Sequence, residues 1–510
     1  MSKISPSARR RRRFLVAGLV AILLAGVVVA VISSGSGPGS GGVAGTVLTV
    51  QRTELGRPVP SGFVGLSMEY PAVEAYAGSD PQALDPVFLA LVRNLAPGQR
   101  PVLRIGGDST DWAWWPIAGV SQPAGIKYDL TPRLLAVTKA LSAALDARLI
   151  MGINLEADST AEAAGEAQAL IAGVGRQWIE ALEVGNEPEL YGTFNWYRQP
   201  DGAGVKGRPR SYDHAAYTSD AANVARALPP ITLAGPASGA PTFIAHLSQI
   251  LDAGPRVGVV TLHAYPLKHC TATSSEATIP HLLADSSSRG LAQSLARYVT
   301  IAHAHAVPLR IDELNAVSCG GRRGVSDTFA SALWSLDGLF AMARAGVDGV
   351  NFHTVPGGIG ELFSFTRANG SWQAYVHPEY YGMMMFAQAT PPGSRLLGLS
   401  GKPASGLSAW ATLASDGHIR VVLINKSLDQ TQVVRVRLPS PAGPAALERL
   451  QAPSVGARYG VTLGGHGFGS ETSTGRLAGP SAGSPVTPTP SGYLIRLPAA
   501  SAAMLTLAPG

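Results

Sequence analysis

Short apolar runs alternate along much of the chain with longer segments in which apolar residues recur every three or four positions. Runs of the first kind are typical of buried strands, and segments of the second kind are typical of amphipathic helices. We predict strands at residues 63–68, 102–108, 148–154, 179–185, 231–235, 257–263, 308–313 and 347–353. We predict helices between them at residues 86–95, 134–145, 212–228, 242–251, 291–303 and 378–388.

Two further helices are indicated by residues that can cap a helix start. Ser159 and Glu162 have the spacing of a capping box, which predicts a helix running towards Trp178. Ser326 is the predicted cap of a helix that stops near Gly346. Eight alternations of strand and helix predict an α/β fold, a (β/α)8 TIM barrel covering residues 63–390.

The pattern changes beyond about residue 390. Short alternating or apolar stretches at 409–413, 419–425, 432–438 and 493–497 are separated by Gly, Pro, Ser and Asp, and no helical period is visible. These features predict an all-β sandwich at residues 391–510. The strand at 47–50 precedes the barrel, so we assign residues 47–62 to the same sandwich domain.

The amino-terminal segment is patterned differently from the rest of the chain. Residues 1–13 form a basic region, residues 14–32 are uncharged and mostly apolar, and residues 33–46 form a linker rich in Gly and Ser. Nineteen such residues are close to the length of a membrane-spanning helix and exceed the apolar core of most signal peptides. We favour a transmembrane signal-anchor over a removed signal peptide. Both predict export, either membrane-anchored and facing outside or secreted.

The charge composition indicates which kinds of molecule the protein can bind. Lys3 and the run 9–13 supply six positive charges, equal to the whole formal net charge of +6. The remaining 34 basic and 34 acidic residues balance, so the basic character does not predict a nucleic-acid surface. The rest of the chain resembles an ordinary globular protein.

Two glutamates stand at the ends of predicted strands. Glu187 follows the apolar run 181–185 within Asn-Glu-Pro, and Glu313 ends the run 307–313. Catalytic groups of such barrels lie at the carboxyl ends of strands, so both side chains can reach one pocket. Glycoside hydrolysis needs a pair of this kind, one acid and one carboxylate. The alternative for Asn-Glu-Pro alone is a simple turn.

An arginine and two cysteines add to this picture. Arg104 lies within an apolar strand, where a charge is rarely buried without a partner. It either holds the barrel together through an ion pair or orients a catalytic carboxylate. Cys270 and Cys319 each follow a predicted strand by a few residues, which allows a disulfide in an exported chain or two free thiols. We predict no metal site and no cofactor.

These residues together resemble the heparanase and β-glucuronidase family, glycoside hydrolase family 79, over about residues 63–385. The resemblance rests on Gly185-Asn186-Glu187-Pro188, Leu103-Arg104-Ile105-Gly106-Gly107, His263-Ala264-Tyr265 and the run from Glu313 to Gly321. Asn-Glu-Pro is shared by many retaining barrel glycosidases, whereas the run after Glu313 is a narrower signal.

The resemblance implies roles for individual residues. Glu187 would be the general acid/base and Glu313 the nucleophile, with retention of anomeric configuration. Tyr265 and Arg104 would hydrogen-bond Glu313. The residues implied in sugar binding are Asn186, Glu69, Asp108 and the loop of Cys319, Gly320 and Gly321, which would contact the uronate. Phe352 lacks the hydroxyl of a tyrosine that helps to bind the sugar acid in heparanase.

We therefore expect a retaining glycoside hydrolase that cleaves terminal β-linked glucuronic acid from glycans or glucuronides. Two alternatives within the class are an endo-β-glucuronidase resembling heparanase and a barrel glycosidase for neutral sugars. An alternative from another class is an inactive, membrane-tethered carbohydrate-binding protein. The expected partners are a carbohydrate substrate and the membrane.

Overall fold

A computed structural model describes residues 45–253, 256–271, 275–438, 443–479 and 483–508. The basic region, the apolar segment 14–32 and nearly all of the predicted linker lie outside these residues. Within the described ranges, no helix combines the length and the apolar character that crossing a membrane requires.

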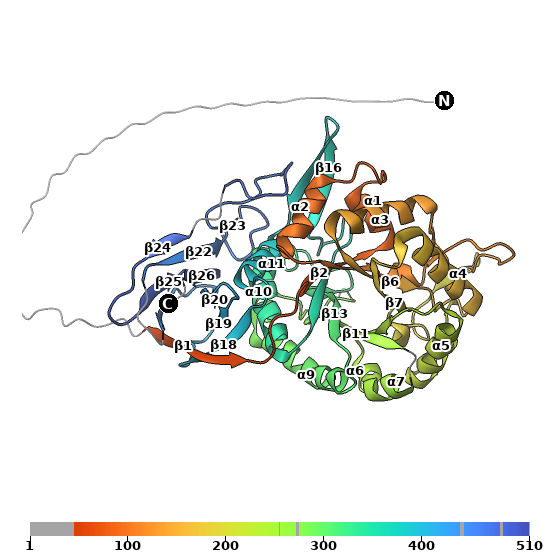
Figure 1. Cartoon of the computed structure of the whole chain (residues 1–510), viewed down its shortest axis with the longest axis horizontal. Coiled ribbons are helices and arrows are strands. Elements are labelled where there is room, and N and C mark those ends of the chain that lie inside the picture. Colours follow the sequence, from red (N-terminus) through yellow and green to blue (C-terminus); the bar gives the residue numbers. More distant parts are fainter. Residues whose placement is uncertain (1–44, 254–255, 272–274, 439–442, 480–482, 509–510) are drawn as a thin grey trace, which may run out of the picture. The chain divides into compact units, whose positions relative to one another are not determined.

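Eight parallel strands close into a barrel, in the order β10-β11-β13-β15-β2-β3-β6-β7 (Figure 1). The strands are β2 (Val64–Glu69), β3 (Val102–Gly106), β6 (Arg148–Ile153), β7 (Ile179–Val184), β10 (Leu233–Ser238), β11 (Val257–Ala264), β13 (Leu309–Leu314) and β15 (Gly349–His353). Except at β10, where the predicted strand 231–235 lies slightly early, each overlaps its predicted range closely. The predicted (β/α)8 barrel is confirmed.

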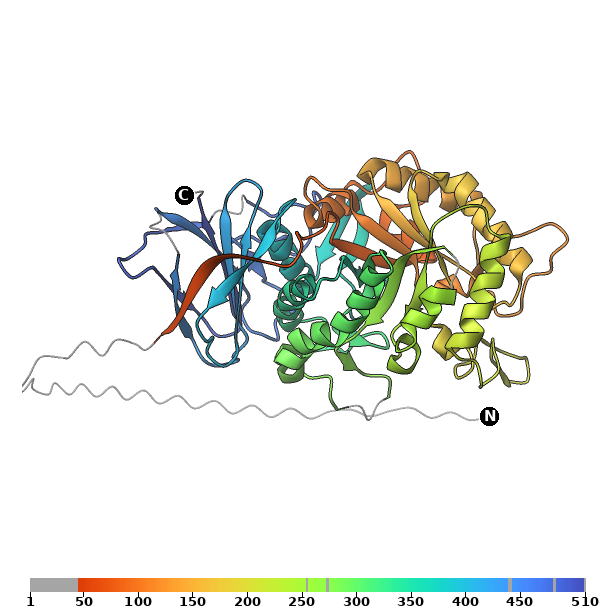
Figure 2. The same ribbon diagram turned by 60° about the horizontal axis from the view of Figure 1, so that its bottom comes forward.

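Helices surround the barrel on its outside (Figure 2). They are α1 (Tyr70–Ala77), α2 (Pro86–Leu95), α3 (Pro132–Leu145), α4 (Thr160–Leu170), α5 (His214–Ala227), α6 (Pro241–Ile244), α7 (Leu247–Ala253), α8 (Ile279–Leu283), α9 (Arg289–Ala304), α10 (Phe329–Ala345) and α11 (Pro378–Ala389). A π-helical turn, Ile171–Gly175, continues α4 towards Trp178. Short turns of 3-10 helix occur at Gly107–Thr110, Pro188–Leu190 and Asp285–Ser287.

The helix predicted at 242–251 is instead divided into α6 and α7. The backbone N–H of His246 bonds to the carbonyl of Phe243, three residues earlier, rather than four. This tighter turn ends the α-helical hydrogen-bond pattern of α6, and the pattern resumes in α7.

The two predicted capping residues differ in outcome. Ser159 caps α4, because its hydroxyl accepts the N–H of Glu162. The Glu162 carboxylate, however, has no hydrogen-bond partner in the described part of the chain, so the reciprocal half of the capping box is missing. The prediction for Ser326 is wrong. The cap residue of α10 is Thr328, and the first two N–H groups of α10 donate to carbonyls in the loop after β22, which makes a side-chain cap unnecessary.

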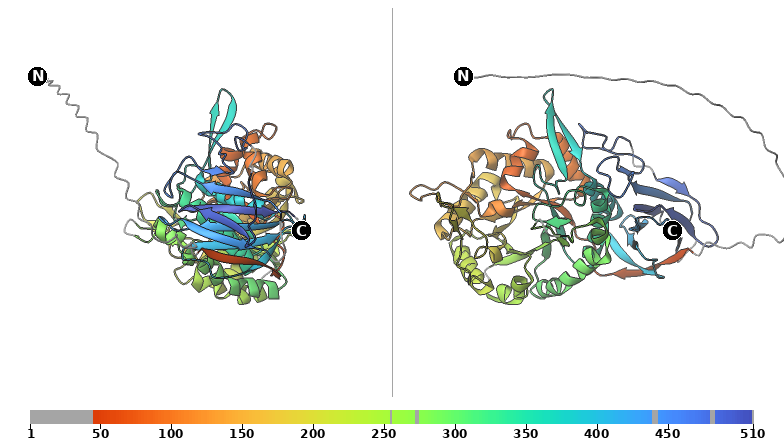
Figure 3. Two further views of the ribbon diagram at one scale, coloured as in Figure 1. Left: turned by 90° about the vertical axis from the view of Figure 1, so that its left-hand side faces the viewer. Right: turned by 180° about the vertical axis from the view of Figure 1, so that it is seen from behind.

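The carboxy-terminal part is all β, as predicted. Its strands are β18 (Arg395–Ser400), β19 (Leu407–Leu413), β20 (Ile419–Asn425), β21 (Gln432–Arg437), β22 (Ala445–Gln451), β23 (Thr462–Leu463), β24 (Ser484–Val486), β25 (Tyr493–Leu497) and β26 (Ser501–Leu507). The amino-terminal strand β1 (Thr46–Leu55) pairs antiparallel with β18 and parallel with β21 (Figure 3, left). All ten strands form one continuous sheet, and residues from both ends of its strand order share one apolar core.

Short two-stranded sheets lie within the loops of the barrel. They pair β4 (Ala113–Trp114) with β5 (Tyr128–Asp129), β8 (Tyr197–Arg198) with β9 (Gly204–Val205), β12 (Leu267–Lys268) with β14 (Val317–Ser318) and β16 (Phe363–Ala368) with β17 (Ser371–Val376). The ladder of β12 with β14 joins the loops that follow β11 and β13, the strand of the predicted nucleophile.

A buried ion pair fastens the β part to helix α10. Lys426 Nζ, which follows β20, lies 2.8 Å from Asp337 Oδ2 on α10, and the indole N–H of Trp410 donates to Asp337 Oδ1 at 2.8 Å. Burial acts to raise the pKa of Asp337, but the Lys426 charge and these hydrogen bonds outweigh it and lower the pKa. The two parts therefore meet through a satisfied polar cluster.

Candidate active site

A bulge in strand β13 brings two consecutive acidic side chains into the barrel. Neighbouring residues of a regular strand point to opposite faces, but the pairing of β13 with β15 shifts register between Ile311 and Leu314. Arg104 consequently approaches both side chains: its Nη1 lies 2.9 Å from Glu313 Oε2 and its Nε lies 3.6 Å from Asp312 Oδ2.

The turn after β7 holds Glu187 in a left-handed conformation, with φ of 46°. Such a backbone costs free energy for a residue other than glycine and persists where its surroundings fix it. Here the Glu187 N–H donates to the Ala237 carbonyl at 2.9 Å, and Pro188 opens the 3-10 turn that follows. Asn186-Glu187-Pro188 is therefore a turn, and it is a turn that delivers a carboxylate to the barrel mouth.

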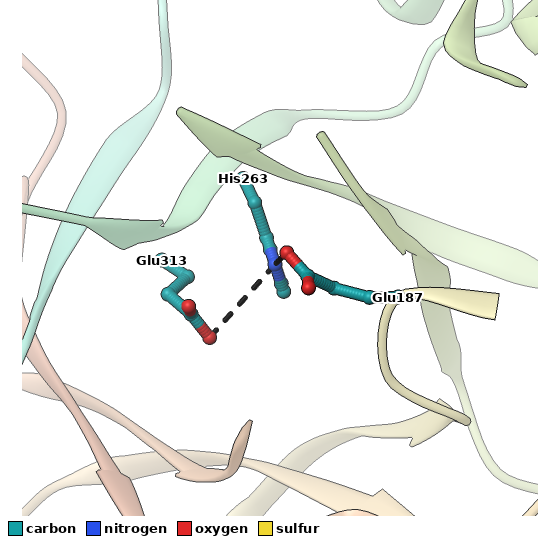
Figure 4. A group of neighbouring side chains, drawn as sticks. All are labelled: Glu187, His263 and Glu313. Atoms are coloured by element: carbon teal, nitrogen blue, oxygen red, sulfur yellow. Dashed lines mark hydrogen bonds and ion pairs between the residues drawn. The ribbon is translucent and has the colours of Figure 1, made fainter. Parts of the chain in front are cut away.

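Glu187 and Glu313 face each other across the mouth, with His263 beside them (Figure 4). One carboxylate oxygen of Glu187 and one of Glu313 lie within 4.8 Å. His263 Nδ1 lies 3.0 Å from Glu187 Oε1 and 3.8 Å from Glu313 Oε2. Inverting enzymes hold their carboxyl groups about 6.5–9.5 Å apart, so oxygens this close are expected of a retaining pair.

Glu313 is held in its ionised form. Arg104 contacts one of its oxygens, and the Tyr265 hydroxyl donates to the other at 2.7 Å. Burial acts to raise the pKa of Glu313, but the charges of His353, His263 and Arg104 and the Tyr265 hydrogen bond hold it well below its ordinary value. A carboxylate kept anionic in this way is suited to nucleophilic attack.

Arg104 fulfils both interpretations that its position in the sequence allowed. Its side chain is fully buried, and its Nε lies 2.8 Å from Glu183 Oε2 inside the barrel. Its Nη2 donates to the Asn186 side-chain oxygen at 2.7 Å. One guanidinium thus forms a buried ion pair and orients two residues of the mouth, Glu313 and Asn186.

His263 contacts Glu187 as a charged imidazole. Burial acts to lower the pKa of His263, but the Glu313 charge and the hydrogen bond to Glu187 raise it to about 10. The imidazole is then protonated at neutral pH and donates from Nδ1. This contact stabilises the anion that remains whenever Glu187 has given up its proton.

Glu69 and Asp108 border the same mouth from β2 and the turn after β3. Glu69 accepts the N–H groups of Asp108 and Ser109, at 3.2 and 2.7 Å, so its carboxylate fixes that turn. Asn186 Nδ2 lies 3.4 Å from Asp108 Oδ1. The Asp108 side chain reaches solvent, yet the surrounding protein and the charges of Glu69, Glu313 and Glu187 raise its pKa to about 7.

The loop after the nucleophile is tied by a disulfide. Cys270 and Cys319 are bonded, as the sequence allowed, and the bridge links the loops that follow β11 and β13. Cys319, Gly320 and Gly321 have successive φ values of 60°, 85° and 85°, which glycine adopts without penalty and cysteine does not. A Cβ on Gly320 would meet nothing within 4 Å, so open space lies beside this part of the loop.

Phe352 does not border the sugar site. Its side chain is fully buried, and its ring packs edge-on against Trp334 with centroids 6.2 Å apart. The next residue, His353, faces the mouth instead: Nε2 lies 3.5 Å from Glu69 Oε1 and Nδ1 lies 3.0 Å from the Ser67 hydroxyl. A missing hydroxyl at position 352 therefore removes no contact with a substrate.

Several polar residues of the site were not assigned a role from the sequence, among them Glu183, Asp312, His263, His353 and Asp111. Asp111 accepts the Asn186 N–H at 3.0 Å and the Tyr191 hydroxyl at 2.7 Å, which positions the Glu187 turn. An acidic residue inside an apolar strand was a usable signal for Glu183 and Asp312. Asp111 and His353 carry no such signal.

Known proteins with similar sequences are glycoside hydrolases. No family model matches the sequence. The chain is 24% identical to a β-glucuronidase of Aspergillus niger over 523 aligned positions, covering 88% of this chain and 91% of the relative. It is 23% identical to a β-glucuronidase of Neurospora crassa, covering 74% of each.

Solved structures of glycoside hydrolases share the fold, and two of them illustrate the similarity. A 4-O-α-L-rhamnosyl-β-D-glucuronidase from Fusarium oxysporum superposes with a TM-score of 0.71 at 20% identity, covering 90% of this chain and all of the other. A family 51 arabinofuranosidase from Xanthomonas axonopodis pv. citri superposes with a TM-score of 0.64 at 14% identity. The match covers 91% of this chain and 99% of the other.

Proposed function

We propose that this chain, a glycoside hydrolase of the β-glucuronidase type that family 79 represents, removes terminal β-linked glucuronic acid from glycans or glucuronides with retention of configuration. The close approach of a Glu187 carboxylate oxygen to a Glu313 carboxylate oxygen, within 4.8 Å, is the observation that carries the proposal. It suits direct attack by one carboxylate on the anomeric carbon, and it is shorter than the gap that inverting enzymes need.

In the first step, Glu187 protonates the glycosidic oxygen while Glu313 attacks the anomeric carbon. The bond between that carbon and the leaving oxygen breaks, and an ester between Glu313 and the sugar forms. The leaving group takes the proton of Glu187. His263, 3.0 Å from Glu187 Oε1, stabilises the resulting carboxylate.

In the second step, the Glu187 carboxylate takes a proton from water, and the water oxygen attacks the same carbon. The bond to Glu313 breaks, glucuronic acid leaves with its original configuration, and Glu187 is protonated again. Arg104 and Tyr265 hydrogen-bond the departing Glu313 carboxylate, which lowers the free energy of the second transition state as negative charge returns to Glu313.

The loop of Cys319, Gly320 and Gly321 is the proposed contact for the sugar carboxylate. Backbone N–H groups in such a turn can converge on an anion. Hydrogen bonds to a charged group contribute about 1.5–3 kcal/mol each, so two of them would separate a glucuronide from a glucoside by orders of magnitude. In this role the disulfide to Cys270 holds the loop in place.

Export of the enzyme is part of the proposal. The basic residues 1–13 and the apolar residues 14–32 have the pattern of an export segment, with an anchor favoured over a cleaved signal. The solvent-exposed Cys270–Cys319 bridge supports an oxidising compartment.

A panel of aryl β-glycosides tests the proposed activity. The protein from residue 42 onward is expected to hydrolyse the β-glucuronide with a kcat/KM at least about 100-fold above the β-glucoside, given hydrogen bonds of the size above. Preference for the glucoside would favour a neutral-sugar glycosidase. Binding of glycans without hydrolysis of any substrate would favour the carbohydrate-binding alternative.

A further inference from the structure

Three carboxylates surround the single guanidinium of Arg104 inside the barrel. Besides Glu313, these are Glu183, 2.8 Å from Arg104 Nε, and Asp312, 3.6 Å from the same nitrogen. The Glu183 and Asp312 side chains are both 0% exposed. The other cation beside Asp312 is the protonated His263, whose Nε2 lies 3.8 Å from Asp312 Oδ1 and makes no hydrogen bond to it. Three ionised carboxylates beside these two positive charges would leave one buried negative charge uncompensated, which is strongly unfavourable.

Several oxygens in this cluster lack a donor. In the described part of the chain, no N–H or O–H group donates to either oxygen of Asp312, and Glu183 has the Thr261 hydroxyl within reach. The two side chains lie within hydrogen-bonding reach of each other. Two facing carboxylates repel unless one of them keeps a proton, and a retained proton would also supply the missing donor.

We propose that Asp312 is a positioning residue that remains a neutral carboxylic acid and donates a hydrogen bond to the Glu183 carboxylate. The shared proton removes the surplus negative charge from the cluster. Arg104 can then hold both Glu183 and the nucleophile Glu313 without leaving a third carboxylate unpaired.

The groups that face Asp312 are consistent with this state. They are Arg104 on β3, Glu183 on β7 and His263 on β11, with Arg310 and Glu313 on its own strand. Burial and the negative charge of Glu183 raise the pKa of Asp312 well above its ordinary value, against the opposing charges of Arg104 and His263. Glu183, by contrast, keeps a lowered pKa because Arg104 outweighs the effect of its burial.

Substitution of Asp312 by asparagine distinguishes a neutral Asp312 side chain from an ionised one. An asparagine at position 312 would keep the shape and one N–H donor towards Glu183, and its oxygen would face His263 Nε2, which lies 3.8 Å from Asp312 Oδ1. If Asp312 is neutral, Asp312→Asn changes no charge in the cluster. If Asp312 is ionised, the same variant removes one negative charge next to the nucleophile.

The activity arm of the test rests on the proposed function. For Asp312→Asn we expect kcat/KM on an aryl β-glucuronide within about threefold of wild type and an unchanged pH profile. Asp312→Ala should lose about 100-fold in kcat with little change in KM, the cost of a slight misplacement of reacting groups. Glu183→Gln removes a true negative charge beside Glu313, so the acidic limb of its pH profile should move to lower pH.

A spectroscopic arm is independent of activity. Infrared difference spectra of wild type minus Asp312→Asn, recorded near pH 9, should contain the carbonyl stretch of a protonated carboxylic acid. At that pH Asp108, with a pKa of about 7, is ionised. Absence of this band would overturn the proposal even if no glycoside is hydrolysed. Three results with Asp312→Asn would also overturn the proposal. The variant could fail to fold, it could lose as much activity as Asp312→Ala, or the acidic limb of its pH profile could move as it does in Glu183→Gln.

Discussion

The Tyr265 hydroxyl donates a 2.7 Å hydrogen bond to Glu313 Oε1, the oxygen opposite the one that Arg104 contacts. Both oxygens of the nucleophile are therefore fixed by donors from different strands and loops. This bond is one of the interactions that lower the pKa of Glu313, and it is the one that can be removed with the least change in shape.

We predict that Tyr265→Phe lowers kcat/KM on an aryl β-glucuronide by roughly 10- to 150-fold, corresponding to a charged hydrogen bond of about 1.5–3 kcal/mol. Glu313 must be ionised to attack, and loss of the donor raises its pKa. The acidic limb of the pH profile of kcat/KM should therefore move to higher pH. Tyr217→Phe is the matched control, because the Tyr217 hydroxyl is buried and bonds only weakly, at 3.4 Å, to the Val184 carbonyl. An unmoved limb in Tyr265→Phe would contradict this account of the nucleophile.

The glycine loop permits a paired test of uronate recognition. Gly320 and Gly324 have φ values of 85° and 79°, and a Cβ at either position would meet nothing within 4 Å. Valine is therefore strained at both positions to a similar degree and clashes at neither. We predict that Gly320→Val lowers the preference for glucuronide over glucoside about tenfold or more, whereas Gly324→Val retains it. Equal preference in the two variants would rule out a specific role for the 319–321 backbone.

The catalytic pair should respond differently to substitution. Glu187→Ala removes the acid, which an aryl substrate with a good leaving group does not need, and it opens space for azide to replace the water that Glu187 activates. Azide should therefore restore part of the turnover and give a β-glycosyl azide, detectable by mass spectrometry and NMR. Glu313→Ala cannot form the covalent intermediate and should lose turnover altogether. Activity close to wild type in both variants would exclude this pair.

The Lys426–Asp337 ion pair gives a prediction about stability. Lys426→Met leaves the Asp337 carboxylate buried without its cation, which costs about 3–5 kcal/mol of unfolding free energy. The folded pKa of Asp337 is depressed, so its stabilising contribution is present at neutral pH and is lost as the pH falls through that depressed pKa. The difference between wild type and variant should therefore shrink on acidification.

Asp285 provides the control for that prediction. It also contacts Lys426, but its side chain is 71% exposed, so Asp285→Asn should cost less than about 1 kcal/mol. Urea unfolding followed by tryptophan fluorescence measures both variants. A larger loss in Asp285→Asn than in Lys426→Met would show that the buried pair is not what joins the two parts.

Much of this fold and of the reacting pair could be predicted from sequence because the signals are local. Each barrel strand is a short apolar run, and Glu187 and Glu313 come directly at the ends of two of them. The disulfide was one of two options, since spacing along the chain does not determine the distance between two cysteines. The continuous ten-stranded sheet could not be foreseen because strand pairing between β1 and β21 is a long-range contact.

The residues around the reacting pair could not be predicted, because their positions also depend on long-range contacts. In a regular strand only one of Asp312 and Glu313 would face the interior, and nothing in the local sequence reveals the bulge that turns both inward. Ser326 had the residue type of a cap, but the loop carbonyls that satisfy α10 come from more than a hundred residues away. Position 352 was compared with a residue that contacts the sugar, yet Phe352 is buried and His353 faces the mouth.

The anomeric configuration of the first-formed product tests the central claim most directly. Proton NMR of an aryl β-glucuronide during the first minutes of hydrolysis, before mutarotation, resolves α- from β-glucuronic acid. The facing Glu187 and Glu313 carboxylates, within 4.8 Å, predict that β-glucuronic acid appears first and the α-anomer only later. Initial release of α-glucuronic acid, or no release of glucuronic acid at all, would contradict it.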